Sequence, residues 1–355
     1  MRPSWRAPSA ATNPAPSRYD PGVSTTSTGT AKTRSTTSAS ATILAAGLLA
    51  GYAADSILAD PQRGHPVALF GQAARKLEKA CYADSRTRGA LYAAVCVGGS
   101  AALGHVVDRS IGRRRGLALA ATATAAWTVI GASSLRREAD AIGELLENGD
   151  LAGARERLPR LVGRDPRGLG ESAVARAVIE SVAENTSDAV VAPLFWGAVA
   201  GTPGLLAYRA ANTLDAMVGH RNERYQNFGW ASARLDDVLN LAPARLTGLL
   251  TVAAAPTVGG LRQQTWQVLR HDARSHPSPN SGHCEASAAG ALGLRLGGTN
   301  VYGSRVEERP QLGNGRSPRG FDIGRANKLS KAVGTSAAVL LSAGALLGRR
   351  GLRHG

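Results

Sequence analysis

The sequence contains little cysteine, few aromatic residues and few acidic residues, and each shortage excludes a class of protein. Three cysteines in 355 residues, with no CxxC pair, exclude a disulfide framework and a cysteine-based zinc site. The sequence has no P-loop motif, no HExxH and no GxSxG, and no GxGxxG follows a strand-like segment. Its seven histidines show no metal-ligand spacing. The commonest signatures of nucleotide-binding proteins, zinc hydrolases and serine hydrolases are therefore absent.

Basic residues outnumber acidic ones by 42 to 26, so the formal net charge is +16. Only five of the basic residues are lysines, and much of the positive charge lies in the first 40 residues and in short loops beside apolar runs. Aromatic residues, which stack on exposed bases, make up only 5% of the chain. We therefore expect no nucleic-acid partner.

Residues 1–40 form a tail of distinct composition. They hold 16 serines and threonines and a single acidic residue, Asp20. Such a segment lacks the apolar residues needed for a core, which predicts disorder. A targeting peptide, or a translation start further along the chain, for instance at Val23, would also account for this composition.

Long uncharged runs dominate the rest of the chain. A membrane-spanning helix needs about 20 apolar residues. Three runs approach or reach this length without a proline, at residues 89–107, 116–135 and 332–348. Three others are shorter or are interrupted by a proline or an aspartate, at residues 41–59, 189–208 and 246–261. Buried helices of a soluble all-α protein are one explanation, but the charged residues that bound the runs and the abundance of Ala and Gly favour an all-α polytopic membrane helix bundle, forming a single domain over residues 41–350.

Three polar blocks separate these runs, at residues 60–88, 136–188 and 262–331. The second block shows apolar residues at helical spacing, which predicts two or three helices, the last beginning near Glu171. The third block is rich in Gly, Pro and Asn and is expected to be mostly loop. No segment alternates in the manner of a β-strand.

Two membrane topologies are compatible with this pattern. The loop 108–115 holds four arginines, and the positive-inside rule places it in the cytosol, which scatters the polar blocks over both faces. Alternatively, the proline-broken run 189–208 and the short run 246–261 are re-entrant or half-spanning, so that residues 60–88 and 136–331 share one face. We prefer the second topology because it gathers the polar residues into one site.

Acidic residues recur at helical spacing in the second polar block. Glu180, Glu184 and Asp188 are four residues apart, so they line one face of a helix if that helix persists to Asp188. Neighbouring carboxylates repel one another, and a cation that prefers hard oxygen ligands, such as Mg²⁺, would relieve this repulsion. Asn185 adds a neutral oxygen. The alternative is a solvated acidic face on which Arg176 pairs with Glu180.

Two further stretches combine acids with amides beside an apolar run. Asn212 and Asp215 are three residues apart just after one run, and Asp236 or Asp237 with Asn240 repeats the theme just before the next. Polar groups at a membrane boundary are costly to bury and are therefore candidates for function. Helix capping and helix–helix hydrogen bonding are the simpler explanation for either pair.

A third stretch has the composition of an anion-binding loop. Arg270 and Arg274 precede Ser278 and Asn280, with prolines between them, and arginine is well suited to binding phosphate or carboxylate. The glycine-rich segment 296–303 adds backbone amides that could hold an anion, although most such segments are plain turns.

Taken in order, these stretches resemble the CobD/CbiB family, the adenosylcobinamide-phosphate synthases of cobalamin biosynthesis. The resemblance runs from about residue 44 to 330, and the first 40 residues have no counterpart in it. It includes LVGRDP at 161–166, IESVAEN at 179–185, DAVVAPLFW at 188–196, NTLDAMVG at 212–219, ARLDDVLN at 233–240, and RHDA at 270–273 followed by SPNSG at 278–282. Residues 51–61 and 65–67 resemble the amino-terminal signature of the family.

The resemblance implies a multi-pass protein of the inner (plasma) membrane and a ligase reaction. The family is credited with joining the corrin propionate carboxylate of adenosylcobyric acid to aminopropanol or its phosphate, through an amide bond, with ATP consumed. A carboxylate and an ammonium do not condense readily in water, so ATP would first convert the carboxylate into an acyl phosphate. The corrinoid, the amine, ATP, Mg²⁺ and the lipid bilayer are thus the implied substrates, cofactors and partners.

The family resemblance and the acid clusters together give a set of candidate site residues. The candidate catalytic residues, as general bases for the amine, are Glu180, Glu184, Asp215 and Asp237. The candidate Mg²⁺ ligands are Glu180, Glu184, Asp188 and Asp236. The candidate substrate-binding residues are Arg164, Asp165, Asn185, Asn212, Arg221, Arg234, Asn240, Arg245, Arg270, Arg274, Ser278 and Asn280.

Two other classes of function stay open at this point. A Mg²⁺-dependent membrane transferase of prenyl or alcohol phosphates would also use Asp and Asn clusters beside the bilayer. A corrinoid transporter, or a scaffold for other enzymes, would need no catalysis. The sequence does not choose between free and phosphorylated aminopropanol, and it leaves the oligomeric state open.

Overall fold

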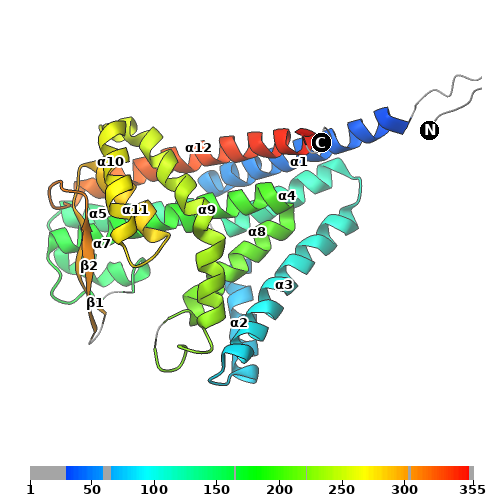
Figure 1. Ribbon diagram of the computed structural model, residues 1–355. Helices are drawn as coiled ribbons and strands as arrows, with labels where there is room; N and C mark the ends of the chain where they lie inside the picture. The colour runs from blue at the N-terminus through cyan, green and yellow to red at the C-terminus, as the bar shows by residue number, and fades with distance from the viewer. Residues whose placement is uncertain (1–28, 59–64, 164, 221, 303–304, 352–355) are drawn as a thin grey trace, which may run out of the picture.

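The computed structural model describes residues 29–58, 65–163, 165–220, 222–302 and 305–351. Helices make up almost all of the described secondary structure, together with one two-stranded sheet (Figure 1). Within the described residues, six helical segments are long and apolar enough to cross a membrane. The predicted all-α bundle with several candidate spans is therefore confirmed.

The elements follow one another with short connections. The first six helices are α1 (Gly29–Leu58), α2 (Pro66–Cys81), α3 (Arg86–Ile111), α4 (Arg115–Val129), α5 (Ala132–Glu147) and α6 (Leu151–Arg157). The next six are α7 (Glu171–Thr186), α8 (Ala192–Val218), α9 (Trp230–Ala254), α10 (Arg262–Asp272), α11 (Ser281–Leu292) and α12 (Phe321–Gly351). The strands are β1 (Leu296–Tyr302) and β2 (Arg305–Leu312).

The amino-terminal helix begins earlier than composition predicts. Residues 29–40, assigned to the disordered tail, form the first turns of α1. Adding residues to an existing helix costs far less than nucleating one, so a helix anchored by the buried side chains of Leu44, Leu48 and Tyr52 extends readily into a Ser/Thr-rich stretch. The expectation for residues 1–28 lies outside the described residues.

Small residues allow the long helices to pack closely. A Cβ added to Gly51 of α1 would lie 2.4 Å from the Cβ of Ala126 in α4, and one added to Gly47 would lie 2.7 Å from that of Thr122. This Gly-x₃-Gly spacing is typical of helix pairs in membranes. On its other side α1 runs alongside α12 (Figure 1), where the hydroxyls of Tyr52 and Thr335 are 3.1 Å apart.

The proline-broken run 189–208 does not form one straight helix. Gly201 has a left-handed φ of 67° and Pro203 follows it, so α8 is interrupted there. A Cβ on Gly204 would lie 2.2 Å from the carbonyl oxygen of Trp196, whereas a straight helix separates residues eight apart by about 12 Å. The two halves of α8 therefore fold back on each other, which is the shape that a re-entrant segment requires; the orientation of the spans stays a prediction.

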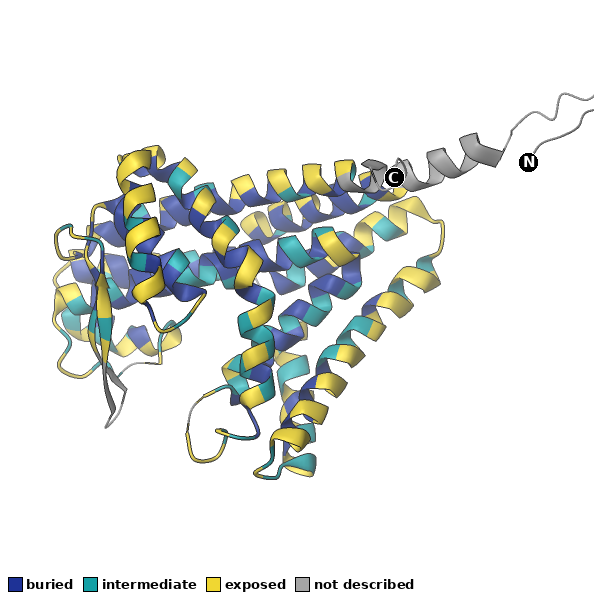
Figure 2. Cartoon of the chain, in the orientation of Figure 1, coloured by how far each residue is buried: buried dark blue, intermediate teal, exposed yellow. Residues whose placement is uncertain are grey.

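Helix α7 lies at the centre of the bundle and begins at Glu171, as the sequence predicts. Its apolar side chains are almost completely buried, among them Val174, Val178, Ile179 and Val182. It packs against α5, α11 and α12, and a π-helical turn, Ser187–Val191, joins it to α8. Figure 2 shows the buried residues gathered along these inner helices, while α3 exposes much of its surface.

The third polar block was predicted to be mostly loop without strands, and this is wrong. It contains α10, α11 and an antiparallel hairpin in which Thr299 pairs with Glu308 and Val301 with Val306. Gly, Asn and Glu have low strand propensity, so the hairpin depends on contacts made elsewhere. Arg176 of α7 supplies them by donating hydrogen bonds to the carbonyl oxygens of Gly297 and Thr299.

Candidate functional site

Three helices bring acids and amides together around Asp236. The Nδ2 of Asn212 in α8 donates to Asp236 Oδ1 at 3.3 Å, and the Nδ2 of Asn240, one turn along α9, donates to Asp236 Oδ2 at 3.0 Å. The hydroxyl of Tyr208 lies 2.8 Å from Asn240 Oδ1 and 3.1 Å from the carbonyl oxygen of Asp188. Asn240 and Tyr208 are almost completely buried, so these bonds fix the carboxylate of Asp236 in place.

Further carboxylates surround this centre. Asp188, which lies in the π-helical turn, interacts electrostatically with Asp236, Glu184 and Asp215. Asp215 also interacts with Asp237. We call Glu184, Asp188, Asp215, Asp236 and Asp237 the acid cluster. Single π-turns inserted into helices occur frequently at functional sites, and here the turn ends the regular spacing that begins at Glu180.

Arg209 brings a positive charge to the acid cluster. It interacts electrostatically with Asp188, and its NH1 donates to Asn212 Oδ1 at 3.4 Å. Because Asn212 bonds in turn to Asp236, Arg209 lies at the edge of the acid cluster. It also lines an open cavity of about 600 Å³ between α2 and α8, together with His65 and Arg75.

Glu184 connects the acid cluster to a second group of acids. Its Oε1 accepts a hydrogen bond of 2.6 Å from the hydroxyl of Ser281, at the start of α11. One turn before it, Glu180 is 2% exposed and accepts a hydrogen bond of 2.8 Å from the amide of Gly297. Arg176 lies 3.9 Å from Glu180, so the expected pairing of these two residues is present, but the buried position of Glu180 excludes a solvated acidic face there.

The second group lines a small cavity between α7, α11 and β2. The cavity has a volume of about 170 Å³ and includes Glu180, Glu184, Asn185, Glu285 and Arg309 in its lining. We call it the glutamate cavity. The Nδ2 of Asn185 donates to the carbonyl oxygen of Ser181, one turn back along α7.

His276 lies beside the glutamate cavity. Its Nε2 is 3.8 Å from Glu285 Oε1, and the amide of Ser278 donates to its Nδ1 at 3.1 Å. Nδ1 also lies 3.3 Å from the carbonyl oxygen of Ser278, so it accepts from the amide in one tautomer and donates to the carbonyl in the other. Burial, with the positive charge of Arg309, lowers the pKa of His276 below the ordinary value of 6.5, so the ring is neutral at pH 7.

Two residues of the predicted anion loop lie near the acid cluster. The Nδ2 of Asn280 donates to the carbonyl oxygen of Asp237 at 2.8 Å, and Arg245 NH1 lies 3.4 Å from Asn280 Oδ1. Ser278 caps the turn, because its hydroxyl oxygen accepts from the amides of Asn280 and Ser281. The glycine-rich segment forms strand β1. Its Gly297 amide donates a hydrogen bond to the carboxylate of Glu180.

Other candidate residues lie at the exposed edge of this centre or apart from it. Asp165 is in the loop before α7, where hydrogen bonds from Arg167 lower its pKa to about 2. Arg234 is exposed and pairs with Asp237 at 3.3 Å. Arg274 is exposed after α10. Two more candidates, Arg164 and Arg221, lie outside the described residues.

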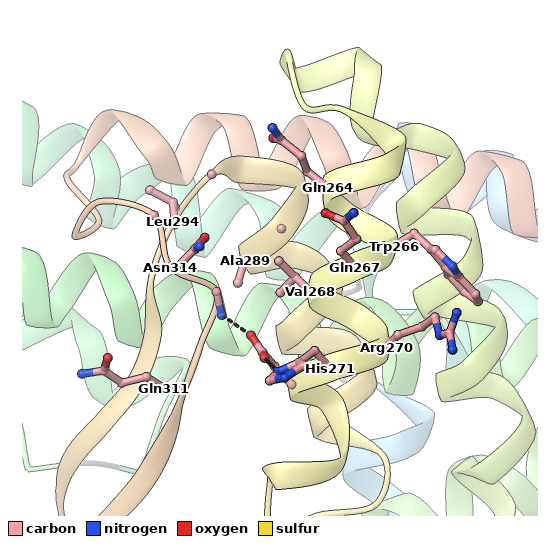
Figure 3. A pocket seen from close by; sticks show the side chains of 15 residues that line it. Gln264, Trp266, Gln267, Val268, Arg270, His271, Ala289, Leu294, Gln311 and Asn314 are labelled. Atoms are coloured by element: carbon pink, nitrogen blue, oxygen red, sulfur yellow. Dashed lines mark hydrogen bonds and ion pairs between the residues drawn. The ribbon is translucent and has the colours of Figure 1, made fainter.

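Arg270 lines a different and larger cavity, of about 930 Å³ (Figure 3). Figure 3 shows its guanidinium beside Trp266, whose ring centroid is 5.8 Å from Arg270 Cζ. The dashed line in that view is the bond of 2.7 Å from the Gly313 amide to Asp272 Oδ2. Gln264, Gln267 and Asn314 also line this cavity, which none of the acid cluster reaches.

The predicted Mg²⁺ ligands do not form a ready-made metal cage. Among the described residues, no three His, Cys, Asp or Glu side chains are grouped so that they could hold a metal ion. Glu180 is separated from Asp188 and Asp236 and has partners of its own. The assignment of Glu180, Glu184, Asp188 and Asp236 to Mg²⁺ stays a prediction.

Several residues of these two groups were not predicted as site residues. Tyr208 is one turn before Asn212 and Glu285 is one turn after Ser281, so helical spacing from the predicted residues would have indicated both. His276 lies in the predicted loop at residues 270–282 but was not selected there, and Arg309 comes from a strand that the sequence did not predict.

Comparison with known proteins finds one matching family and several curated relatives. The family described as CobD/Cbib protein matches residues 48–330. Cobalamin biosynthesis protein CobD of Mycobacterium tuberculosis (strain ATCC 25618 / H37Rv) is 50% identical over 296 residues, which cover 83% of this chain and 94% of that protein. The proteins of the same name from Geobacter metallireducens and Rhodobacter capsulatus are 45% and 44% identical, over 79% and 74% of this chain and 89% and 83% of their own lengths.

No solved structure matches the chain. The matched region begins within α1 and ends within α12, so it contains the acid cluster and the glutamate cavity completely. The extent of this match and the identity to the curated relatives establish that the chain belongs to the CobD/CbiB family.

Proposed function

We propose that this protein is an enzyme of cobalamin biosynthesis in the cell membrane. In this proposal it joins a corrin propionate carboxylate of adenosylcobyric acid to aminopropanol or its phosphate through an amide bond, and it consumes ATP. The name of the curated relatives supports the pathway, and the six apolar helices support the membrane location.

The meeting of the acid cluster with amides from separate helices is the observation that carries the proposal. Acids from α7, the π-helical turn, α8 and α9 lie together although they are up to 53 residues apart, from Glu184 to Asp237. A bundle needs no such group for stability, since partly buried like charges repel one another. A group of this kind suits a reaction that handles phosphates through a cation and takes a proton from an ammonium.

The proposed chemistry has two steps. A carboxylate oxygen of the corrinoid attacks the γ-phosphorus of ATP, so that an acyl phosphate forms and ADP leaves. The amine nitrogen, after giving its proton to a carboxylate of the site, attacks the acyl carbon and phosphate leaves. Three members of the acid cluster, Glu184, Asp215 and Asp237, are candidates for the proton acceptor. Arg209 and Arg245 are placed at its edge, where they would bind anionic oxygens of the substrates.

The donor set fits Mg²⁺ held jointly with a substrate. Mg²⁺ usually binds through one or two carboxylates plus substrate phosphates, so the absence of three grouped ligands among the described residues agrees with such a site. Asp188 and Asp236, which interact electrostatically, would hold the ion together with the substrate phosphates. When bound, Mg²⁺ would neutralise charge on the phosphates.

A reconstitution experiment tests this proposal. The purified full-length protein, in detergent or nanodiscs, is supplied with adenosylcobyric acid, ATP, Mg²⁺ and either aminopropanol or its phosphate. Mass spectrometry should detect the corresponding amide, and omission of ATP should abolish it. Turnover of an isoprenoid diphosphate with no amide, or corrinoid uptake into proteoliposomes with no product, would instead support the transferase or the transporter.

A further inference from the structure

A cavity of about 460 Å³ lies where four helices meet beside the loop between α3 and α4. Residues of α1, the end of α3, the start of α4 and the break in α8 line it. We call it the arginine cavity, because Arg113 and Arg115 are part of its lining. The loop lies at one end of the bundle (Figure 1), and the described lining residues include no member of the acid cluster.

The charges around the arginine cavity are mostly positive. Residues 108–115 contain four arginines and one acid, Asp108. The side chains of Arg113 and Arg115 are exposed, and neither makes a hydrogen bond or an ion pair with a described residue. The lining itself holds these two arginines and Asp108, so its net charge is +1. A ligand of negative charge would give the two arginines the partner that the described part of the chain does not supply.

The arginine cavity continues inward from these charges to apolar side chains. Helix α3 and the segment that begins with α4 are both candidate membrane spans, so the loop that joins them lies at a membrane surface. Thr122 is seven residues beyond Arg115, so the lining of α4 extends about 10 Å into the span. Ile43 of α1 and Ile111 of α3 add apolar surface. The cavity is therefore charged at the surface and apolar within, as a phospholipid is.

A buried hydroxyl in the lining lacks a hydrogen-bond partner. Thr202 is 3% exposed, and its Oγ1 makes no hydrogen bond with a described residue. Five other helical threonines donate to the carbonyl oxygen four residues earlier, as Thr213 does to Arg209 at 2.7 Å. Gly201, whose φ is 67°, interrupts α8 directly before Thr202, so the ordinary acceptor is not in place. A ligand oxygen in the cavity would accept this proton.

We propose that the arginine cavity binds the headgroup of an anionic phospholipid. The phosphate lies between Arg113 and Arg115, because guanidinium groups form paired hydrogen bonds with phosphate oxygens. Thr202 donates to a phosphate or ester oxygen, and Asp108 accepts from a hydroxyl of the headgroup. The acyl chains begin along α1 and α4. This inference requires only the membrane location and does not rest on the proposed reaction.

The size of the arginine cavity fits such a headgroup. A volume of about 460 Å³, divided by about 30 Å³ for a water-sized group, leaves room for roughly fifteen such groups. The glycerol–phosphate–glycerol unit of phosphatidylglycerol has about fifteen non-hydrogen atoms by its formula, so it fills this volume. A corrin has several times as many atoms and does not enter the cavity.

A fluorescent phosphatidylglycerol tests the site directly. The full-length protein in a neutral detergent is titrated with the labelled lipid, and fluorescence anisotropy measures binding. We expect saturable binding that unlabelled phosphatidylglycerol reverses and phosphatidylcholine does not. Displacement by millimolar inorganic phosphate would assign the cavity to free phosphate, and equal displacement by phosphatidylethanolamine would assign it to an ammonium headgroup on Asp108. Either result would overturn the proposal.

The four arginines beside the cavity provide a matched control. Arg113→Gln and Arg115→Gln each remove a charge that lines the cavity. Arg109→Gln and Arg114→Gln each remove an exposed charge of the same segment that does not line it. We expect the Kd for phosphatidylglycerol to rise roughly tenfold or more in the first pair and to stay within about twofold in the second. General attraction of a basic loop to anionic lipid would give four equal effects, and that result would overturn the inference.

Two conservative variants separate binding from folding. Thr202→Val keeps the shape of the side chain and should raise the Kd roughly threefold or more. Without lipid it should melt no lower than wild type, because it removes a hydroxyl that has no described partner. Arg115→Lys keeps the charge and should bind more tightly than Arg115→Gln, which damage to the loop would not explain.

Thermal unfolding gives a readout without the label. Because a ligand of the folded state stabilises it, phosphatidylglycerol should raise the melting temperature of the wild-type protein. It should raise that of the double variant Arg113→Gln/Arg115→Gln much less, although the two proteins should melt alike without lipid, since both arginines are exposed. An equal rise with phosphatidylcholine and phosphatidylglycerol in the wild-type protein would contradict a site for anionic lipid.

Discussion

Helix α3 and the segment from α7 to α8 have the same mean hydropathy but opposite surroundings. The best window has a mean hydropathy of 1.6 in both, yet 22% of it is buried in α3 and 61% in residues 171–218. In α3 four large apolar residues are more than half exposed, namely Leu91, Val95, Leu103 and Val106. Hydropathy therefore identifies apolar helices, but it does not say whether they face lipid or other helices.

Polar residues distinguish the two segments more clearly than apolar ones do. The apolar stretch of α3 from residue 89 to 107 carries no acid, whereas the inner segment carries Glu180, Glu184, Asp188 and Asp215 among buried helices. Ionisable groups at such depth are expensive, and they persist where they pair with one another or perform a function. This comparison leads us to expect large functional effects inside the bundle and small effects on the outer face.

Removing the charge of Asp236 should have the largest effect. Asp236→Asn keeps the shape but replaces a carboxylate that two asparagines hold in position. We expect amide formation to fall by about a hundredfold or more, the range found when a group that stabilises a transition state or transfers a proton is lost. Mass spectrometry of the amide at saturating substrates provides the measurement.

The matched control for this prediction is Glu156→Gln, which removes an exposed acid on α6. Its activity should equal that of wild type. Equal activity in both variants would remove Asp236 from the mechanism and would make the acid cluster a structural feature.

Two leucines test the difference between the inner and outer helices directly. Leu194 in α8 is fully buried, and Leu194→Ala should cost about 2–5 kcal/mol of stability. Leu103 in α3 is 59% exposed, and Leu103→Ala should cost only about 0.5 kcal/mol, because lipid chains are as apolar as leucine. Thermal unfolding in nanodiscs would compare the two variants.

Leu103→Lys tests whether the exposed side of α3 faces lipid or water. If this position faces the middle of the bilayer, a lysine there costs about 2.5–3.5 kcal/mol. If it faces water, the same substitution is almost neutral. A stable and fully folded Leu103→Lys protein would therefore contradict the placement of α3 in the membrane.

The sequence predicted those parts of the fold whose signal is local. The apolar runs, the break at Pro203 and the start of α7 are each encoded by a few neighbouring residues. The acids of α7, α8 and α9 were also found, because charged residues beside apolar runs are conspicuous and their helical spacing is short.

Structure that depends on distant contacts was not predicted. Helix α11 is built of Ala, Gly, Ser and Cys with little periodicity, since it is buried on almost all sides and needs no polar face. The hairpin that carries Arg309 is held by Arg176, more than 120 residues earlier in the chain. Because the sequence did not predict these two elements, it did not predict that Glu285 and His276 lie near Glu180, and it did not predict the glutamate cavity.

The smallest expected effect concerns the stability of the folded protein at acidic pH. Burial and Arg309 lower the pKa of His276, and burial with Arg245 and Arg274 lowers that of His283. A histidine with a lowered pKa binds protons more readily in the unfolded state. Its contribution to stability is therefore constant above about pH 6.5 and falls as the pH drops below that value, by at most about 1.4 kcal/mol per pH unit for each group.

His276→Gln should remove part of this pH dependence, whereas His105→Gln on the exposed surface of α3 should not. The measurement is the melting temperature between pH 8 and pH 5.5, taken as the difference between each variant and wild type, so that the titration of the many carboxylates cancels. Glu285, Glu184 and Glu180 also face His276 and favour its protonated form, which limits the size of the effect. A melting temperature of His276→Gln that falls in parallel with wild type would mean that folding does not shift the pKa of His276.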